Sequence, residues 1–172
     1  MRKSMCSALA ALVFFTYSTT ARSDDLLTAV EQDVSLPVNL EEFLKSPQVI
    51  RYRFVIVDSE TLWDTFEAVR DLDSVQDGPT LDFDLFEGLS FEMRIVEVHH
   101  RYWSSSATLV NNAPDYGKDT DANIFATVRL ERDASASIDI YAAGEHYSVM
   151  PIDGRENHVV VQLDPDEMPS LD

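Results

Sequence analysis

Four histidines, His99, His100, His146 and His158, are the side chains of this sequence best suited to metal binding or proton transfer. A hydrolytic zinc site needs three protein ligands and an open position. In a strand the adjacent His99 and His100 point to opposite faces, so they cannot hold one ion together. One of them would have to meet His146 or His158 across a sheet. This spacing favours packed or solvated histidines, and we predict no cofactor and no histidine metal site.

The segment DTDAN places oxygen ligands at Asp119, Asp121 and Asn123, the alternate positions with which a calcium-binding loop begins. The glycine expected next and the glutamate expected at the twelfth position are both absent. These three residues are therefore weak calcium candidates, and a solvated loop is the favoured interpretation.

Nucleophilic and paired-carboxylate chemistry also lack support in the sequence. No glycine elbow holds the serines of 104–106, and no histidine lies at a motif-like spacing from them. Asp82 and Asp84 share one face of a predicted strand, as glycosidase carboxylates could, but alternating acids on an exposed face are ordinary. H-E-x-x-H, G-x-S-x-G, P-loop and dinucleotide motifs are missing. We predict that the chain is not an enzyme and has no catalytic residues.

The elements that would position such side chains are mostly strands. The segment LDFDLFEGLSFEMRIVEV (81–98) alternates apolar and polar residues on both sides of Glu87-Gly88, which predicts a hairpin. VIRYRFVIVD (49–58) alternates as well and predicts a strand with one buried face. Further predicted strands are RYWSSSATLV (101–110), ANIFATVRLE (122–131), SIDIY (137–141), HYSVMPI (146–152) and HVVVQL (158–163). AAGE (142–145) predicts a tight hairpin in which Gly144 takes a positive φ.

One clear helix is predicted near residues 59–70. Leu62, Phe66 and Val69 lie at i, i+4 and i+7, the spacing of one amphipathic face, and Asp58 or Ser59 is the expected N-cap. Trp63 adjoins this face and is expected to cover the edge of the sheet. About eight strands with one helix predict a mainly β (α+β) fold, either an antiparallel β-sandwich or a strongly curved sheet.

The region before residue 50 is predicted to be a peripheral arm. Apolar residues at 26, 27 and 30 suggest one weak helical turn. In NLEEFLKSP, Asn39 and Glu42 have the spacing of a capping box, and Pro47 marks the end of a short helix.

The first 23 residues have the pattern of a secretory signal peptide: a basic start, an apolar stretch and small residues before the expected cleavage after Ala21 or Ser23. Cleavage would remove Cys6, the single cysteine, so the mature chain would have no disulfide and no thiol. We expect an exported protein, periplasmic or extracellular, with no membrane attachment after cleavage.

The composition narrows the partners. The chain has 172 residues, 45% of them hydrophobic, and a formal net charge of −18. That content is enough for a real core, while the negative field repels nucleic acid and anionic lipid and attracts basic partners. The expected parts are the signal peptide 1–23, an arm 24–49 with a short helix, a β domain 50–163 and an acidic tail 164–172.

From residue 50 onward the order of features resembles the N-terminal pro-domain of bacterial secreted zinc metalloproteases of the metzincin, reprolysin-like type. The matching segments, in order, are RYRFVIVDSETL, LDFDLFEGLSFEMRIVEV, the Trp103 strand with ATLV, and GEHYSVMPIDGRENHVVVQLDPDEMP. Ser105 stands where that family often has glycine, no cysteine remains to block a zinc ion, and the chain stops three residues after Pro169, where the family continues into the protease.

This resemblance implies a non-enzymatic protein that acts in trans on a secreted zinc metalloprotease, as inhibitor or folding assistant. It implies partner-binding residues in an inserted acidic tail and at the adjacent hairpin: Asp153, His158, Asp164, Asp166 and Glu167. An extended tail would add a strand to the protease cleft. The alternative is an exported β-sandwich that binds a ligand or assists envelope assembly and has no protease partner. The oligomeric state stays open.

Overall fold

The computed structural model describes residues 26–30, 36–69, 78–111, 124–133, 135–152 and 157–167, and most of them lie in strands. The elements in chain order are β1 (Leu27–Ala29), α1 (Val38–Leu44), β2 (Val49–Val57), α2 (Ser59–Val69), β3 (Thr80–Phe86), β4 (Leu89–His100), β5 (Ser104–Asn111), β6 (Phe125–Glu131), β7 (Ala136–Ala142), β8 (Glu145–Pro151), β9 (Asn157–Leu163) and a 3-10 turn at Pro165–Glu167. The prediction of a mainly β chain with a helix near residues 59–70 is confirmed.

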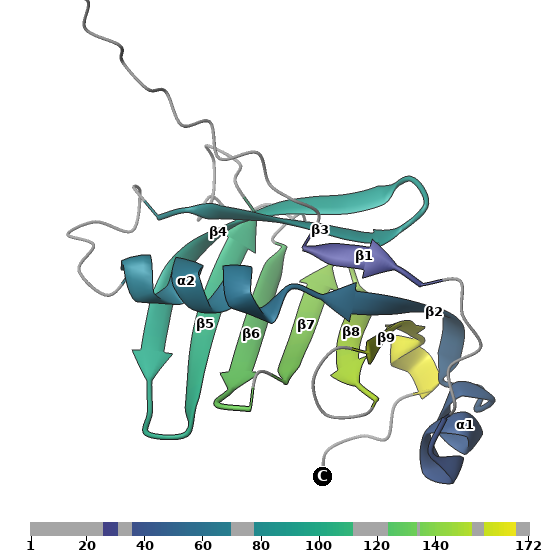
Figure 1. Cartoon of the computed structure of the whole chain (residues 1–172). Coiled ribbons are helices and arrows are strands. Elements are labelled where there is room, and N and C mark those ends of the chain that lie inside the picture. The colour runs from purple at the N-terminus through teal and green to yellow at the C-terminus, as the bar shows by residue number, and fades with distance from the viewer. Residues whose placement is uncertain are drawn as a thin grey trace, which may run out of the picture.

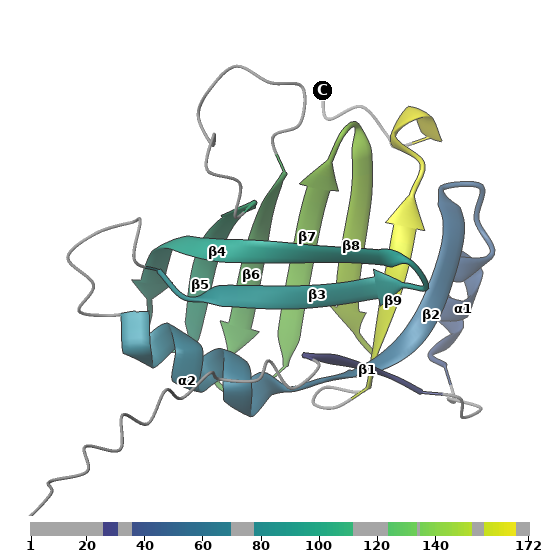
Figure 2. The ribbon, with the colours of Figure 1, turned by 90° about the horizontal axis from the view of Figure 1, so that it is seen from above.

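All nine strands of the described residues belong to one antiparallel sheet, in the order β1-β2-β9-β8-β7-β6-β5-β4-β3. Strands β3 to β9 follow chain order, and β2 then pairs with β9. The sheet curls until its two outer strands, β1 and β3, are neighbours, as Figure 2 shows. The fold is therefore the strongly curved sheet of the two predicted forms.

The hairpin of β3 and β4 crosses over the strands β5 to β9 (Figure 2). It can do so because β4 changes partner along its length: Leu89–Arg94 pair with β3, and Met93–His100 pair with β5. The register of the second pairing shifts between Ile95 and Glu97, where a β-bulge bends the strand. The first half of β4 thus lies with β3 in the layer that crosses over β5 to β9, and the second half continues beside β5 in the layer beneath.

Gly78 allows the chain to enter this hairpin. A Cβ atom at Gly78 would lie 2.1 Å from the Ile95 carbonyl oxygen, and the Ile95 N–H donates to the Pro79 carbonyl at 3.0 Å. Only glycine leaves room for so close an approach of two backbones.

The main core fills the space between the two layers. The alternate residues Leu81, Phe83, Leu85, Met93 and Ile95 of the hairpin are at most 6% exposed, while the acids of the opposite face are exposed. The turn between β7 and β8 has positive φ at Ala143 and Gly144, as a two-residue type I′ turn requires. Both hairpin predictions are confirmed.

Helix α2 lies along one side of the curled sheet (Figure 1). Leu62 and Phe66 are completely buried, which confirms the predicted apolar face. Asp58 is the N-cap: its Oδ1 accepts from the Thr61 N–H at 2.9 Å and its Oδ2 from the Thr61 hydroxyl at 2.7 Å. Loss of either large apolar side chain would cost about 2–5 kcal/mol of stability.

A second, smaller core lies on the outer face of β9, where α1 packs. Leu44 of the helix meets Val159, Val161 and Leu163 of the strand. Residues of β9 are therefore buried on both faces, which explains its continuous apolar sequence.

Two predictions for the arm are wrong. Residues 27–29 form strand β1 against Val55–Val57 and no helical turn, because β2 offers them a free edge. Helix α1 begins at Val38 after Pro37, with no side-chain cap. Asn39 therefore lies inside the helix and cannot be its N-cap. The helix starts two residues earlier than the capping-box pattern indicates, directly after Pro37, whose fixed φ is compatible with a helix start.

Strand β2 places Val55 and Val57 in the core, at 0% and 4% exposed, and leaves Ile50, Tyr52 and Ile56 on its outer face. Both faces of this strand are rich in apolar residues, so alternation alone does not identify the buried one. Among the described residues, no helix is long and apolar enough to cross a membrane.

The two arginines of β2 tie it to the crossing hairpin. The Arg51 guanidinium lies 4.1 Å from the centroid of the Phe86 ring, and its Nε donates to Gln162 Oε1 at 2.7 Å. Arg53 donates to the Asp84 carbonyl. The contacts with Phe86 and Asp84 hold the hairpin against β2, because β2 does not pair through its backbone with β3 or β4.

Candidate functional site

The structure brings together one histidine and one of the serines that the sequence patterns gave no reason to treat as a nucleophile. Ser105 Oγ lies 2.9 Å from His100 Nδ1 across the β4–β5 hairpin, and Glu67 Oε1 of α2 lies 3.9 Å from that same nitrogen. A nucleophile–base–acid relay needs the serine and the carboxylate on opposite ring nitrogens. Here both meet Nδ1, and Ser105 is only 2% exposed. The three residues join two strands and α2, and their geometry does not suit catalysis.

His99 and His100 point to opposite sides of β4, as predicted. His99 is exposed and its Nε2 lies 3.0 Å from Glu97 Oε1. Among the described residues, no three histidine, cysteine or acidic side chains lie close enough together to hold a metal ion.

His146 belongs to a row of stacked rings on the outer face of β6, β7 and β8. Its ring lies 4.3 Å from that of Tyr141, which lies 4.7 Å from that of Phe125. The strand register makes these residues cross-strand neighbours. His146 Nε2 also lies 3.1 Å from Asp139 Oδ1. This hydrogen bond, together with a weaker one from Ser148, lowers the pKa of Asp139 against the opposing effect of burial. The row stabilises the sheet.

His158 was predicted to bind a partner, and its burial contradicts this. The side chain is completely buried in β9, and its Nε2 accepts from the Ala136 N–H at 3.4 Å. The His158 side chain points into the space enclosed by the curled sheet, because the inner face of β9 forms part of the core. It therefore cannot contact a partner protein.

The acidic residues after β9 are accessible. Asp166 and Glu167 are exposed and Asp164 is half-buried. They form a compact turn, in which Asp164 Oδ1 accepts from the Asp166 N–H at 3.0 Å and the Asp164 N–H donates to the Gln48 carbonyl at 2.9 Å. In this structure Pro165–Glu167 are therefore wound rather than extended, contrary to the strand-like tail of the prediction.

The remaining predicted site residues lie outside the described residues: Asp153 and the weak calcium candidates Asp119, Asp121 and Asn123.

A different group of residues gathers at one end of the curled sheet. Tyr102 and Trp103 form the β4–β5 turn and are 76% and 63% exposed, the largest exposed aromatic surfaces among the described residues. Their rings meet edge to face with centroids 4.4 Å apart. Arg132, in the β6–β7 turn, lies over both rings at 5.6 Å. We call Trp63, Tyr102, Trp103 and Arg132 the aromatic patch.

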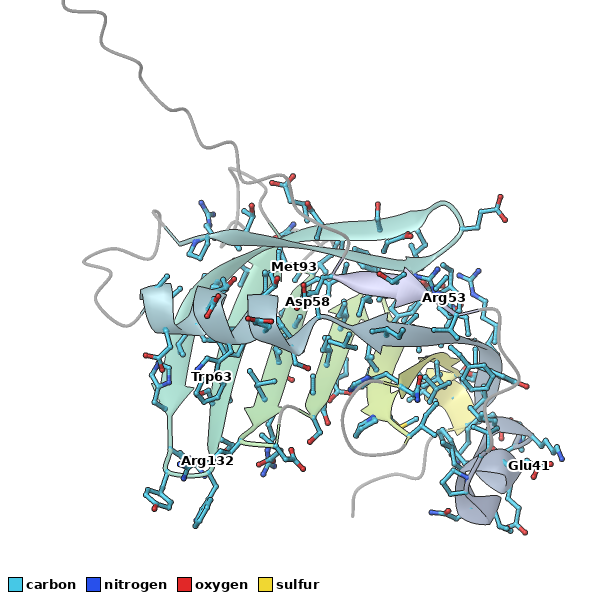
Figure 3. All side chains as sticks on the ribbon, in the orientation of Figure 1. Glu41, Arg53, Asp58, Trp63, Met93 and Arg132 are labelled. Carbon is cyan, nitrogen blue, oxygen red and sulfur yellow. The ribbon has the colours of Figure 1, made fainter. Side chains whose placement is uncertain are left out.

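Trp63 joins the patch from α2. Figure 3 shows its side chain below the helix, on the side where Arg132 lies. It is 38% exposed although its neighbours Leu62 and Phe66 are buried. Trp63 was expected to cover the sheet edge; it instead lines a hollow with Leu130 at the end of β6, which is an inner strand of the sheet.

Two hollows adjoin the patch and share Glu131 and Arg132. The larger, of about 600 Å³, is completed by Trp103 and Asp133. The smaller, of about 290 Å³, lies between α2 and β6 and is completed by Ser59, Glu60, Trp63 and Leu130. The lining of the smaller hollow thus includes both apolar side chains and two carboxylates.

Two of the carboxylates around the hollows have partners within the protein. Arg129 Nε lies 2.6 Å from Glu131 Oε1. Asp133 Oδ1 accepts from the N–H and hydroxyl of Ser135 at 3.1 and 2.9 Å, which closes the β6–β7 turn. Three carboxylates, Glu60, Glu131 and Asp133, thus border a region in which Arg132 is the basic lining residue.

Sequence reasoning missed this patch, although one signal was present. Two aromatic residues directly before SSS lie where a strand turns back, a position usually filled by polar residues and glycine. Adjacent exposed aromatic residues form a contiguous apolar surface of the kind that marks interaction sites.

Comparisons with known proteins add little. No family model matches the chain, and no curated protein matches it significantly. A chain from a solved structure described as "Structure of a chaperone-substrate complex" superposes with a TM-score of 0.46 and 19% identity, over 69% of this chain and 88% of that one. This likeness is too distant to support an argument about function.

Proposed function

We propose that this protein is an exported, non-enzymatic binding module that docks another protein through the aromatic patch. The observation that carries the proposal is the convergence of Trp63, Trp103 and Arg132 from three separate segments around two hollows. Tryptophan, tyrosine and arginine are the residues that most often dominate the energy of protein–protein interfaces. Among the described residues, the one serine–histidine–carboxylate group has a geometry unsuited to catalysis.

The specific form of this proposal is action in trans on a secreted zinc metalloprotease, as inhibitor or folding assistant. It rests on the order of sequence segments that resembles metalloprotease pro-domains. In this form the exposed Asp166 and Glu167 contact the protease after the turn at Pro165–Glu167 unwinds. Removal of the chain after Leu163 would then abolish inhibition and leave docking at the aromatic patch intact.

A second candidate is a carrier of a small apolar ligand. The observation that favours it is a further hollow of about 310 Å³ between α1 and the end of β8, lined by Leu40, Phe43 and Met150 among others. This volume is at the low end for ligand sites, so we favour protein docking.

The test compares three forms of the purified protein as bait for its own exported proteins: wild type, a Trp63→Ala/Trp103→Ala variant, and a Tyr52→Ala control. Tyr52 is an exposed aromatic on β2, outside the patch. Captured fractions are identified and assayed for casein hydrolysis with and without each form. We expect wild type and control to capture the same protein and the patch variant to lose it.

The outcomes separate the candidates. Inhibition of a captured zinc protease by wild type and by the control supports the protease form. Patch-dependent capture of a protein with no protease activity supports the binding module and refutes that form. Capture that the patch variant retains in full refutes docking at the aromatic patch.

A further inference from the structure

The smaller hollow has the composition of a site for one basic side chain. Trp63 and Leu130 supply apolar surface, and Glu60 and Glu131 supply carboxylates. A lysine or arginine side chain matches this lining, because its apolar stem can lie on the apolar residues while its charged end meets the carboxylates and stays partly in water. A tryptophan ring also attracts a cation placed over its face.

The size of the hollow favours a single side chain. Its volume of about 290 Å³ lies just below the range of sites that enclose a whole small ligand. Its two carboxylates come from different elements, Glu60 from the first turn of α2 and Glu131 from the end of β6. An ammonium group between them would gain charge-assisted hydrogen bonds from both sides.

Charge complementarity identifies the occupant. The protein has 31 acidic and 13 basic residues, so its field concentrates basic segments at its surface. Arg132, the basic residue of the lining, lies over the rings of Tyr102 and Trp103. Arg129 pairs with Glu131 through Oε1, and Glu60 is exposed.

On this basis we infer that the hollow between α2 and β6 binds a lysine or arginine side chain of the docked protein, flanked in that protein by apolar residues that lie on Trp63 and Trp103. This inference rests on the proposed function, because it specifies which partner segment the aromatic patch recognises. It predicts that the partner presents a basic, apolar segment rather than an acidic one.

The test uses three synthetic peptides, acetyl-Ala-Leu-X-Leu-Ala-amide, in which X is lysine, norleucine or glutamate. The chain has only two tryptophans, so their two indole N–H signals in a nitrogen-15 NMR spectrum report each side of the patch separately. A Trp63→Phe variant assigns the signals. We expect the lysine peptide alone to shift the Trp63 signal to saturation at low salt, and added salt to weaken it.

A Glu60→Gln/Glu131→Gln variant should raise the Kd of the lysine peptide about tenfold, equivalent to about 1.4 kcal/mol. The matched control, Asp82→Asn/Glu87→Gln, removes two exposed carboxylates of the β3–β4 hairpin and should leave the Kd within about twofold of wild type.

Three results would overturn the inference: equal binding of the norleucine peptide, an equal effect of the control variant, or no shift of the Trp63 signal by the lysine peptide. None of these results would test the proposed function, which depends on the capture experiment alone. If the patch variant captures the same protein as wild type and the lysine peptide still binds specifically, docking at the aromatic patch is refuted and the site for a basic side chain stands.

Discussion

The backbone N–H of Arg132 donates a 2.8 Å hydrogen bond to the Trp103 carbonyl, and its guanidinium lies 5.6 Å from the centroid of the Trp103 ring. One residue thus links the β6–β7 turn to the β4–β5 turn through both main chain and side chain. The backbone bond fixes the spacing of the two turns, and the side-chain contact orders two rings that are largely exposed to water.

Replacement of Arg132 by alanine should therefore affect binding far more than folding. The backbone bond survives the substitution, and an exposed cation–π contact contributes about 0.5–1 kcal/mol. We expect a loss of at most about 1 kcal/mol in the free energy of unfolding by urea, and a larger loss in partner affinity. Arg132→Lys is the control, because it keeps the charge and loses the planar stacking group. An unfolding loss above about 3 kcal/mol would identify Arg132 as a structural residue.

Asp58→Ala should remove the N-cap of α2 and lower stability at neutral pH by about 1 kcal/mol. The hydrogen bonds from the Thr61 N–H and then the Thr61 hydroxyl lower the pKa of Asp58 in the folded state. The stabilisation is therefore present above the unfolded pKa of about 4 and is lost as pH falls through the lower folded value. Urea unfolding of both proteins across this range should show curves that converge in acid. Asp64→Ala, which removes an exposed acid of the same helix and leaves the cap in place, is the matched control.

Gly78→Ala should destabilise the protein by about 2 kcal/mol or more, because the new methyl group would meet the Ile95 carbonyl oxygen at 2.1 Å. The comparison is Gly88→Ala in the β3–β4 turn, where φ is +75° and the space around a Cβ is open. That substitution should cost about 1 kcal/mol through backbone conformation alone. Thermal or urea unfolding measures both, and equal losses would show that the approach of Gly78 to Ile95 is not the limiting contact.

Tyr147 should ionise well above the ordinary pH range of a tyrosine. Burial, followed by the hydrogen bond and charge of Glu145, raises its pKa to about 12. Since the folded state favours the neutral phenol, this contribution to stability is full below the unfolded pKa of about 10 and is lost as pH rises toward 12. Absorbance titration of phenolate should show one late step that disappears in Tyr147→Phe. If Tyr147→Phe instead loses absorbance near the ordinary tyrosine pKa of about 10, the buried position of Tyr147 is contradicted.

The sequence predicted those parts of the fold in which local pattern and tertiary burial agree. The alternation around Glu87-Gly88, the Asp58 cap and the positive φ of Gly144 each have a local physical cause, and all three are found in the structure. Strand β2 is different because both of its faces are apolar. Its buried face is decided by β9 and the crossing hairpin, which lie far away in sequence.

The aromatic patch could not be predicted for the same reason. Trp63, Trp103 and Arg132 belong to a helix and two separate turns, and no spacing in the sequence connects them. They meet because the β4–β5 and β6–β7 turns of an antiparallel meander fall at the same end of the sheet. Likewise, the apolar segment HVVVQL predicted a strand for His158 but could not show that β9 is buried on both faces by α1 and the core.

The pairing of β2 with β9 has a consequence for how the protein is made. Val49 of β2 lies opposite Leu163 of β9, so β2 cannot complete its pairing until β9 has been synthesised. During synthesis, β3 to β8 can pair with their predecessors as they emerge, but β2, with β1 and α1 attached, has no sheet to join until β9 is complete. Contacts so distant in sequence form slowly because a long loop must close first. Folding should therefore finish only after β9 has left the ribosome.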